Sequence, residues 1–418
     1  MQPTSYRSTL PIKLIVQLAV RNLLRSRKRS LITVSSVFFA VLLALVAESI
    51  NEGSHDALIE TSVKLSTGYV QMMDTGYRAT PSLDLAIPWN ESYYERLSTL
   101  PFKAGYIPRI QNFVLAAGPR KTSGALIQGI IPDAENDFNA LSSKIIKGSL
   151  FDQKGGAVLG RELAEYLQVQ VGDTVVVIGQ GYQGTLASGK YHVAGVVKLS
   201  VKELNKITFF LPLEEAQRLF DMPGLVTQVL VNPENPEQAP ELASAIRTKF
   251  QSEGITALTW EEMLPELLQA LAFDTISNRV LLAILYVVVG FGIFGTVLTM
   301  TLERTREFGM LISIGMKRKL LALTTVVETL LLGLSGVLLG VAVGFPILLY
   351  MHFHPIPLGG DLQAIADDFG IEPMLYFSIK PVIFLVQGLV ILLISSLIAI
   401  YPYRFVMKLN FLKAARGD

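Results

Sequence analysis

The segment RVLLAILYVVVGFGIFGTVLTMTLERTREFGMLISIGMKRKLLALTTVVETLLLGLSGVLLGVAVGFPILLY, residues 279–350, contains two long apolar runs separated by a short charged loop. About 20 apolar residues suffice for a helix to cross the hydrocarbon core of a bilayer. Both runs reach that length and predict two membrane spans. Two further runs, LITVSSVFFAVLLALVAESI (31–50) and PVIFLVQGLVILLISSLIAIYPY (381–403), predict four spans in all.

The composition of the chain supports a mixture of membrane spans and a polar domain. Of the 418 residues, 50% are hydrophobic and 17% are charged, which is too apolar for an ordinary soluble enzyme. The polar region between the first two spans is long enough for one or two domains. The chain has no cysteine, which excludes disulfides, thiolate metal sites and a cysteine nucleophile. A net charge of +1 gives no indication of nucleic-acid binding.

The positions of the basic residues predict how the chain is oriented in the membrane. Lysines and arginines occur before the first span, between the second and third, and after the fourth, whereas the remaining short loop is acidic. Both termini are therefore expected to be cytoplasmic. A cleaved signal peptide is the alternative for the first span, but Leu45 is large for a cleavage site and we favour an uncleaved anchor.

The expected organisation follows from these spans and their orientation. It consists of a cytoplasmic amphipathic helix within 1–30, spans at 31–50, 276–302, 320–350 and 381–403, an extracytoplasmic domain at 51–275, a cytoplasmic loop at 303–319, an extracytoplasmic loop at 351–380 and a cytoplasmic tail at 404–418.

A basic amphipathic helix is expected ahead of the first span. Ile12, Ile15, Val16, Ala19 and Leu23 recur at helical spacing, and basic residues occupy the other face. Such a helix is suited to lie on the inner leaflet of the membrane. A plain cytoplasmic extension of the first span is the alternative.

The loop between the second and third spans carries more apolar residues than a simple turn needs. Phe308, Leu311 and Ile312 cluster among charged residues in a short amphipathic pattern. Exposed apolar residues of this kind indicate a docking surface for another protein, and a helix packed on the bilayer is the alternative. In the following span, Gly336, Gly340 and Gly344 are spaced four apart, which allows close approach of another helix within the chain or across a dimer.

The stretch GQGYQGTLASGKYHV (179–193) matches two nucleotide-binding patterns, G-x-G-x-x-G and an incomplete G-x-x-x-x-G-K. Both motifs require a helix to begin at the last glycine. Here β-branched and aromatic residues follow instead and predict a strand. We therefore interpret the stretch as the turn of a β-hairpin.

The large domain has a mixed α and β pattern. Strands are expected at 69–72, 125–129, 157–159, 174–178, 191–199 and 227–231, and a helix at 241–254. The segment 160–178 indicates a helix, a turn at Gly172-Asp173 and a strand. A helical run from Thr259 leads directly into the second span without a flexible linker, which indicates a stiff connection to the membrane.

Residues able to carry catalysis or bind metal are few. His352 and His354 lie near Asp361, Asp367 and Asp368, but the interleaved prolines prevent a helix from placing both histidines on one face, and a metal site is disfavoured. Glu328 is an acidic residue inside a predicted span; it is either functional or close to the inner headgroups. An enzymatic function is disfavoured.

The sequence ERTREFGMLISIGMKRKLLALTTVVETLLLGLSGVLLGVAVG (303–344) resembles the coupling-helix and third-span block of FtsX/LolE/MacB-type ABC transporter permeases, which typically read ERxREIGxLRAxGxxRxxI before a glycine-notched helix. RNLLRSRKRS (21–30), LGRELAEYLQVQVGDTVVVI (159–178) and FLPLEEAQRLF (210–220) extend the resemblance to essentially the whole chain.

The resemblance implies an integral membrane α-helical protein with a large α+β extracytoplasmic domain in two halves. A Porter-like half would comprise 51–110 and 208–275, and a Sabre-like half 111–207.

The resemblance also implies partners and sites. Two such permeases, identical or paralogous, would pair in the membrane and bind two copies of an ABC ATPase subunit, which would hold the ATP and Mg²⁺; no cofactor, metal or nucleic acid is expected on this chain. The coupling helix would seat in the ATPase through Glu303, Arg304, Arg306, Glu307, Phe308, Gly309, Leu311 and Gly315, with Phe308 and Leu311 as anchors. A weaker implication is a substrate surface formed by Leu42, Leu43, Val46, Val280, Ile284 and Val287.

Two functions remain open at this point. The first is ATP-driven extrusion or release of a hydrophobic or lipidated substrate, such as a lipoprotein, at the outer face of the bacterial cytoplasmic membrane, with a carrier or periplasmic adaptor as a further partner. The second is signalling without transport, in which the same movement activates a cell-wall hydrolase or reports an antibiotic.

Overall fold

The computed structural model describes residues 12–151, 156–360, 363 and 373–409. These residues form two compact units. The membrane unit contains the chain up to His55, Leu271–Ile356 and the chain from Leu375 onward. The large domain contains Asp56–Ala270 and Pro357–Met374.

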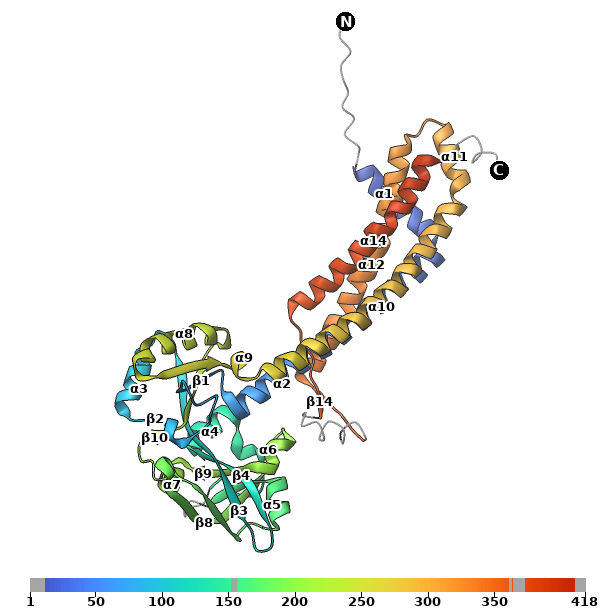
Figure 1. The fold of residues 1–418 in the computed structure, drawn as a ribbon. Coiled ribbons are helices and arrows are strands. Elements are labelled where there is room, and N and C mark those ends of the chain that lie inside the picture. Colours follow the sequence, from blue (N-terminus) through green and yellow to red (C-terminus); the bar gives the residue numbers. More distant parts are fainter. Residues whose placement is uncertain (1–11, 152–155, 361–362, 364–372, 410–418) are drawn as a thin grey trace. The chain divides into compact units, whose positions relative to one another are not determined.

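The membrane unit is helical (Figure 1). Its helices are α1 (Ile12–Arg25), α2 (Arg27–Ser62), α10 (Pro265–Glu303), α11 (Thr305–Ser313), α12 (Arg318–Phe353) and α14 (Pro381–Lys408). Among the described residues, α2, α10, α12 and α14 are long and apolar enough to cross a membrane, which confirms the four predicted spans. At about 1.5 Å per residue, α2, α10 and α12 are longer than a hydrocarbon core of about 30 Å requires.

Small residues allow the helices of the membrane unit to pack closely. The structure places Gly336, Gly340 and Gly344 of α12 against α2 of the same chain. A Cβ atom at Gly340 would lie 2.7 Å from a methyl carbon of Val41, and one at Gly336 would lie 2.5 Å from Val37. Close approach of two backbones increases van der Waals contact between the helices. This contact contributes to helix association because the hydrophobic effect does not drive helices together within lipid.

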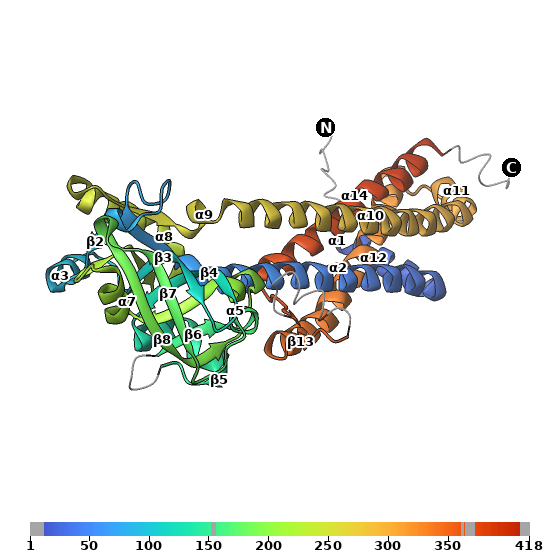
Figure 2. The ribbon, with the colours of Figure 1, turned by 60° about the horizontal axis from the view of Figure 1, so that its bottom comes forward.

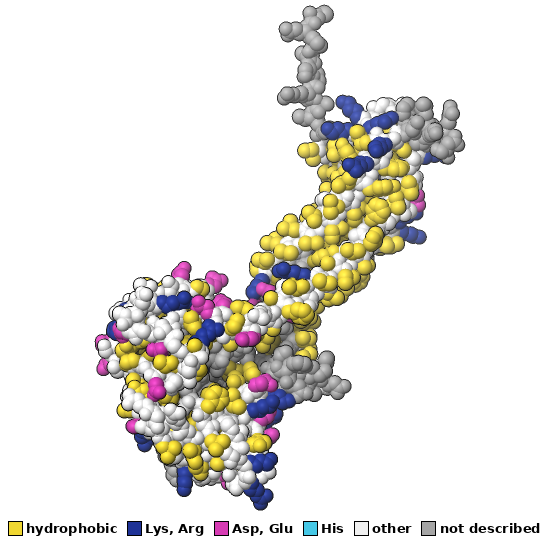
Figure 3. Space-filling model, in the orientation of Figure 1, with side chains coloured by type: hydrophobic (Ala, Val, Ile, Leu, Met, Phe, Trp, Pro, Cys, Tyr) yellow, Lys and Arg dark blue, Asp and Glu magenta, His cyan; other side chains and the backbone are white. Residues whose placement is uncertain are grey.

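Apolar side chains cover much of the outer surface of the membrane unit. Figure 3 shows hydrophobic side chains along its helices, with Lys and Arg side chains at the end near α1 and α11. Exposed apolar residues include Leu43, Val288, Phe291, Leu338 and Leu389. An apolar surface of this extent suits contact with lipid or with another membrane helix rather than with water.

The large domain is built on one ten-stranded sheet (Figure 2). The strands follow the order β12 (Ile255–Thr259), β1 (Val70–Asp74), β11 (Gln228–Pro233), β3 (Ala104–Ala117), β4 (Thr122–Ile130), β9 (Thr208–Pro212), β6 (Ala157–Gly160), β8 (Leu186–Val197) and β5 (Ile145–Gly148), while β7 (Thr174–Gln180) pairs with β3 and β8. All six predicted strand regions are strands, which confirms the mixed α and β pattern.

Short helices and two further strands complete the large domain. They are α3 (Glu91–Ser98), α4 (Pro132–Asn139), α5 (Arg161–Leu167), α6 (Lys202–Ile207), α7 (Leu213–Phe220), α8 (Ala239–Phe250) and α9 (Trp260–Met263), with the pair β2 (Ile87–Pro88) and β10 (Leu225–Val226). The predicted helix at 241–254 is α8, which ends in a short 3₁₀ turn before Gly254 at φ 71°. Helix α8 packs on β1 and β12, and α7 packs on β4.

The two halves of the large domain share strand β3. Ala104–Arg109 pairs with β11, and Ile110–Ala117 pairs with β4. The predicted boundary at residue 208 coincides with the start of β9, which pairs with β4 and β6 rather than with a strand of the first half. One continuous apolar core underlies both halves.

The glycine-rich stretch forms a hairpin, as predicted. Strands β7 and β8 pair antiparallel from Thr174 opposite His192 to Gln180 opposite Leu186. Gly184 has φ 78° in the connecting turn, a conformation that L-residues rarely adopt. Strand β8 continues through Gly189, so no helix begins at the last glycine of either pattern.

The helical run into the second span is interrupted. Helix α9 ends at Met263, Leu264 has φ −118° and ψ 56°, and α10 begins at Pro265. The helical run predicted from Thr259 is therefore two helices rather than one. Proline disfavours the helical conformation in the residue before it, which explains the break at Leu264. From Pro265 to Glu303 the helix is continuous.

A buried ion pair fixes the end of α2 in the large domain. Helix α2 is followed by a π-helical turn, Val63–Thr67. Arg109 donates from Nη1 to the carbonyl oxygen of Ser66 at 3.1 Å and from Nε to Glu135 Oε2 at 3.1 Å. Both charged side chains are 1% exposed. A cation at a helix C-terminus stabilises its partly negative carbonyl groups.

Candidate functional site

Helix α11 is a short helix with a defined end. It spans Thr305–Ser313, and Gly315 follows at φ 103°. The N–H of Met316 donates to Leu311 at 3.0 Å and the N–H of Gly315 to Ile312 at 3.0 Å. This pair of bonds is the Schellman motif, which satisfies the last helical carbonyls and requires a residue that tolerates positive φ.

Phe308 is buried within the chain. Its side chain has no exposed surface and packs with Leu321 and Ala322 of α12 and Val406 of α14. The prediction of Phe308 as a surface anchor is therefore wrong. A nine-residue helix can turn an apolar residue inward or outward, and the positions of α12 and α14 decide which.

The exposed apolar side chains of this region lie at the end of α11. Ile314 is 84% exposed, Met310 46% and Leu311 38%. Leu311 is thus on the surface, as its predicted anchor role requires. Met310 and Ile314 were not singled out from the sequence, although their separation of four residues places them on one side of the helix.

Ion pairs join the α11 region to the N-terminal helices. Arg25 of α1 pairs with Glu307, and Arg29 of α2 pairs with Glu303. The hydrogen bond from Arg25 holds the pKa of the Glu307 carboxyl below its ordinary value. Both pairs are partly exposed, so each contributes little by itself. Together they connect the loop to two other helices.

Glu328 of α12 lies at the centre of a buried polar network. Its carboxylate accepts from Asn22 Nδ2 of α1 at 2.5 Å and from Arg304 Nη1 at 2.7 Å. Arg304 also approaches Glu307 at 3.5 Å, and its guanidinium lies 5.3 Å from the centre of the Phe308 ring. A buried carboxylate requires such partners, because an unpaired buried charge is costly. Asn22 could not be recognised from spacing, since 306 residues separate it from Glu328.

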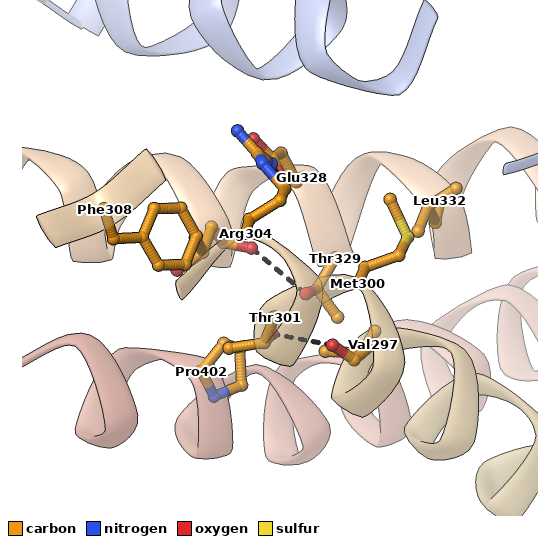
Figure 4. A pocket seen from close by; sticks show the side chains of 10 residues that line it. Val297, Met300, Thr301, Arg304, Phe308, Glu328, Thr329, Leu332 and Pro402 are labelled. Carbon is orange, nitrogen blue, oxygen red and sulfur yellow. Dashed lines mark hydrogen bonds and ion pairs between the residues drawn. The ribbon is translucent and has the colours of Figure 1, made fainter. Parts of the chain in front are cut away.

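A small cavity adjoins this network. Arg304, Phe308, Glu328 and Pro402 line it together with threonines of α10 and α12 (Figure 4). Its volume is about 20 Å³, which is room for about one water molecule. Such a volume holds no substrate. We call the place where α1, α10, α11, α12 and α14 meet around Glu328 the polar junction.

The residues predicted to contact an ATPase therefore separate into two groups. Glu303, Arg304 and Glu307 form ion pairs within the chain, and Phe308 and Gly309 are buried. Arg306, Leu311 and Gly315 are exposed. The second group, with Met310 and Ile314, presents a surface that another protein can reach without breaking one of these ion pairs, and Glu303 and Glu307 are partly exposed as well.

The residues predicted to form a substrate surface lie on α2 and α10. Leu43, Val280, Ile284 and Val287 are each more than half exposed. Leu42 and Val46 are partly buried, and Val46 packs against the core of the membrane unit. The structure thus gives an exposed apolar track on two helices rather than an enclosed pocket.

The histidines of the loop after α12 make local contacts. His352 Nδ1 lies 2.6 Å from the carbonyl oxygen of Phe377, and His354 stacks on Tyr350. Asp361, Asp367 and Asp368 lie outside the described residues. Within the part of the chain that the structure covers, no group of three or more His, Asp or Glu side chains is placed to hold a metal ion.

Comparison with known protein families identifies relatives of both parts of the chain. A family model described as the MacB-like periplasmic core domain matches residues 30–249, more than half of the 418 residues. The FtsX-like permease C-terminal model matches residues 279–411. This chain belongs to the FtsX/MacB family of ABC transporter permeases. It is a multi-pass membrane protein, and its large domain is the extracytoplasmic domain of the family.

Individual relatives are distant. The chain is 26% identical over 254 residues to the lipoprotein-releasing system transmembrane protein LolC of Xylella fastidiosa, covering 59% of this chain and 61% of LolC. An uncharacterized ABC transporter permease of Methanocaldococcus jannaschii is 22% identical, with 97% of this chain and 98% of that protein covered. The periplasmic region of MacB from Actinobacillus actinomycetemcomitans covers 51% of this chain and 98% of its own, at 12% identity and a TM-score of 0.35.

Proposed function

We propose that this chain is the permease subunit of an ABC transporter that releases a lipidated substrate, such as a lipoprotein, at the outer face of the bacterial cytoplasmic membrane. The observation that carries the proposal is the exposed apolar track on α2 and α10, which includes Leu43 and Ile284. An acyl chain leaving the bilayer needs a continuous apolar surface on the way out. The similarity to LolC, a lipoprotein-releasing protein by name, supports the same substrate class.

The orientation that the proposal requires has both termini in the cytoplasm. Basic side chains near the membrane, such as Arg25, Arg29, Lys317 and Arg404, occur at the same end of the helices as α1 and α11. The positive-inside rule places that end in the cytoplasm. The extracytoplasmic domain then lies on the other side of the membrane, where a carrier or periplasmic adaptor would receive the substrate.

The energy source in this proposal is a separate subunit. Members of the family are permease subunits that work with ATPase partners. ATP and Mg²⁺ would bind to that partner and no cofactor to this chain. The exposed residues Met310, Leu311 and Ile314 would insert into the partner, since apolar side chains on a short helix are suited to a groove. A second permease copy or paralogue would complete the complex.

The polar junction provides a route for the movement. ATP-driven closure of the ATPase pair would displace α11. Glu307 and Glu303 would pass that displacement to α1 and α2, and Arg304 would pass it to α12 through Glu328. Helices α2 and α10 continue beyond the length that a bilayer requires, so movement at the cytoplasmic end would reach the outer face.

A reconstituted system tests the proposal. The permease and its ATPase are placed in proteoliposomes with a triacylated lipoprotein, and the lipoprotein released to an external carrier is measured. We expect release that requires ATP and an acylated substrate. ATP hydrolysis without release of any lipoprotein would contradict the proposal and favour signalling without transport.

A further inference from the structure

Polar side chains connect α2 and α10 along a short seam. Asn278 Nδ2 donates to Glu48 Oε2 at 2.8 Å, and Asn51 Nδ2 donates to Asp274 Oδ2 at 2.7 Å. His55 Nε2 lies 2.8 Å from the same Asp274 oxygen. Spacings of three and four residues on α2, and of four on α10, place these side chains on facing sides of antiparallel helices. We call these five residues the seam.

The contact of α2 with the segment before α14 has a different character. Ser49 Oγ donates to the carbonyl oxygen of Ser378 at 2.7 Å, and the N–H of Ser378 donates to the carbonyl oxygen of Ser49 at 2.9 Å. A Cβ atom at Gly53 would lie 2.6 Å from the carbonyl oxygen of Tyr376. Direct backbone contact with reciprocal hydrogen bonds leaves little freedom for these two segments to separate.

The seam, in contrast, is held by side chains alone. The side chain of Asp274 is 60% exposed and that of His55 14% exposed, and the bond between Asn278 and Glu48 is partly buried. Exposed polar pairs contribute little net free energy, because water and ions compete for both partners. Of these two contacts of α2, the one with α10 therefore costs less to open, because it breaks side-chain bonds only.

The seam adjoins the exposed apolar track along both helices. Leu43 precedes Glu48 on α2, and Val280, Ile284 and Val287 follow Asn278 on α10. We infer that the seam is a releasable clasp, which must open between α2 and α10 before a lipidated substrate can leave the track. This inference rests on the proposed function for its substrate, and on the seam itself for its mechanics.

The absence of native cysteine makes the clasp directly testable. Asn51→Cys with Asp274→Cys is bridged by a short, reducible thiol-specific cross-linker in the complex with the ATPase. Glu52→Cys with Lys380→Cys is the matched control, because that ion pair, 2.9 Å long, joins α2 to the residue before α14. We expect bridging at 51 and 274 to lower the rate of ATP-dependent lipoprotein release at least tenfold, and cleavage of the cross-linker by a reducing agent to restore that rate. The control bridge is expected to leave more than half of the unbridged rate. Undiminished release after complete bridging, or an equal loss in the control, would overturn the inference.

A second readout separates failure of the clasp from failure of the proposed function. The rate of bridging between positions 51 and 274 is measured in the nucleotide-free complex and in the complex trapped with ATP and vanadate. A rate at least fivefold different between the two states supports an opening seam even if the unbridged complex releases no lipoprotein, which would refute only the substrate. Equal rates in the two states show a permanent joint and overturn the clasp.

Discussion

Phe308 and Ile314 are six residues apart and have opposite environments. Phe308 is fully buried and Ile314 is 84% exposed. Ile314→Asp is expected to abolish co-purification of the ATPase without lowering the melting temperature of the permease, since a carboxylate replaces an apolar contact only at the partner surface. Phe308→Ala is expected to destabilise the permease by roughly 3 kcal/mol through loss of buried contacts.

Co-purification and thermal unfolding of the two variants check this assignment. Thr305→Asp, at the other end of α11, is a control for an added charge in the loop. Normal ATPase binding by Ile314→Asp would show that the exposed end of α11 is not the docking surface.

Arg109 is predicted to be important for the stability of the extracytoplasmic domain. Arg109→Met leaves Glu135 buried without its cation and is expected to destabilise the extracytoplasmic domain by about 3–5 kcal/mol. The double variant with Glu135→Leu is expected to recover most of that loss, because two apolar side chains need no partners. Chemical denaturation of the full chain measures both. A double variant no more stable than the single one would contradict the role of the unpaired charge.

At the level of helices, the α2–α12 contact depends on the absence of side chains. Gly340→Val is expected to force the two helices apart and lower stability by about 1–3 kcal/mol, because its Cβ would meet Val41 at 2.7 Å. Gly295→Val is the matched control in α10, where an added Cβ meets nothing within 4 Å. Thermal unfolding in nanodiscs compares them. Equal effects at both positions would show that general glycine loss, not helix contact, decides the outcome.

The connection between α1 and α11 should depend on pH. The pKa of Glu307 is lowered by the hydrogen bond from Arg25, so the pair stabilises the fold above the ordinary glutamate pKa and loses that contribution as pH falls through the lowered value. Unfolding of the wild type is compared with Glu307→Gln between pH 7 and pH 3. We expect the difference in free energy of unfolding between wild type and variant to be below about 1 kcal/mol, since the pair is partly exposed, and to disappear near pH 3. A difference that grows on acidification would contradict the pairing.

Sequence patterns predicted the elements better than their partners. Hydropathy located the four spans, and the alternation of residues located the strands, because each depends on local periodicity. The extension of α2 to Ser62 could not be read from its polar end. The inward direction of Phe308, the Arg109–Glu135 pair and the bond between Asn22 and Glu328 depend on segments that are distant in sequence, and no periodicity encodes such contacts. The break at Leu264 had a readable signal in Pro265.

In the proposed function, α11 at one end of the membrane unit would dock on the ATPase, and the apolar track on α2 and α10 would pass the substrate to the outer face. The polar junction around Glu328 and the seam around Asp274 lie at opposite ends of the membrane unit. A permease that moves lipidated substrates needs both a connection to its ATPase and an exit for the acyl chains. Residue patterns alone indicated the connection to the ATPase. They indicated the exit for the acyl chains only weakly, because an exposed apolar residue in a span resembles any lipid-facing residue.

Photocross-linking at the track shows whether the permease binds an acylated substrate there. A photoreactive amino acid is placed at Ile284, with Leu389, an exposed residue of α14, as the control position, in membranes where the ATPase is trapped before hydrolysis. We expect capture of an acylated lipoprotein at Ile284 and not at Leu389. Lipid alone at both positions, with the complex assembled and its ATPase active once released from the trap, would contradict lipoprotein release as the function.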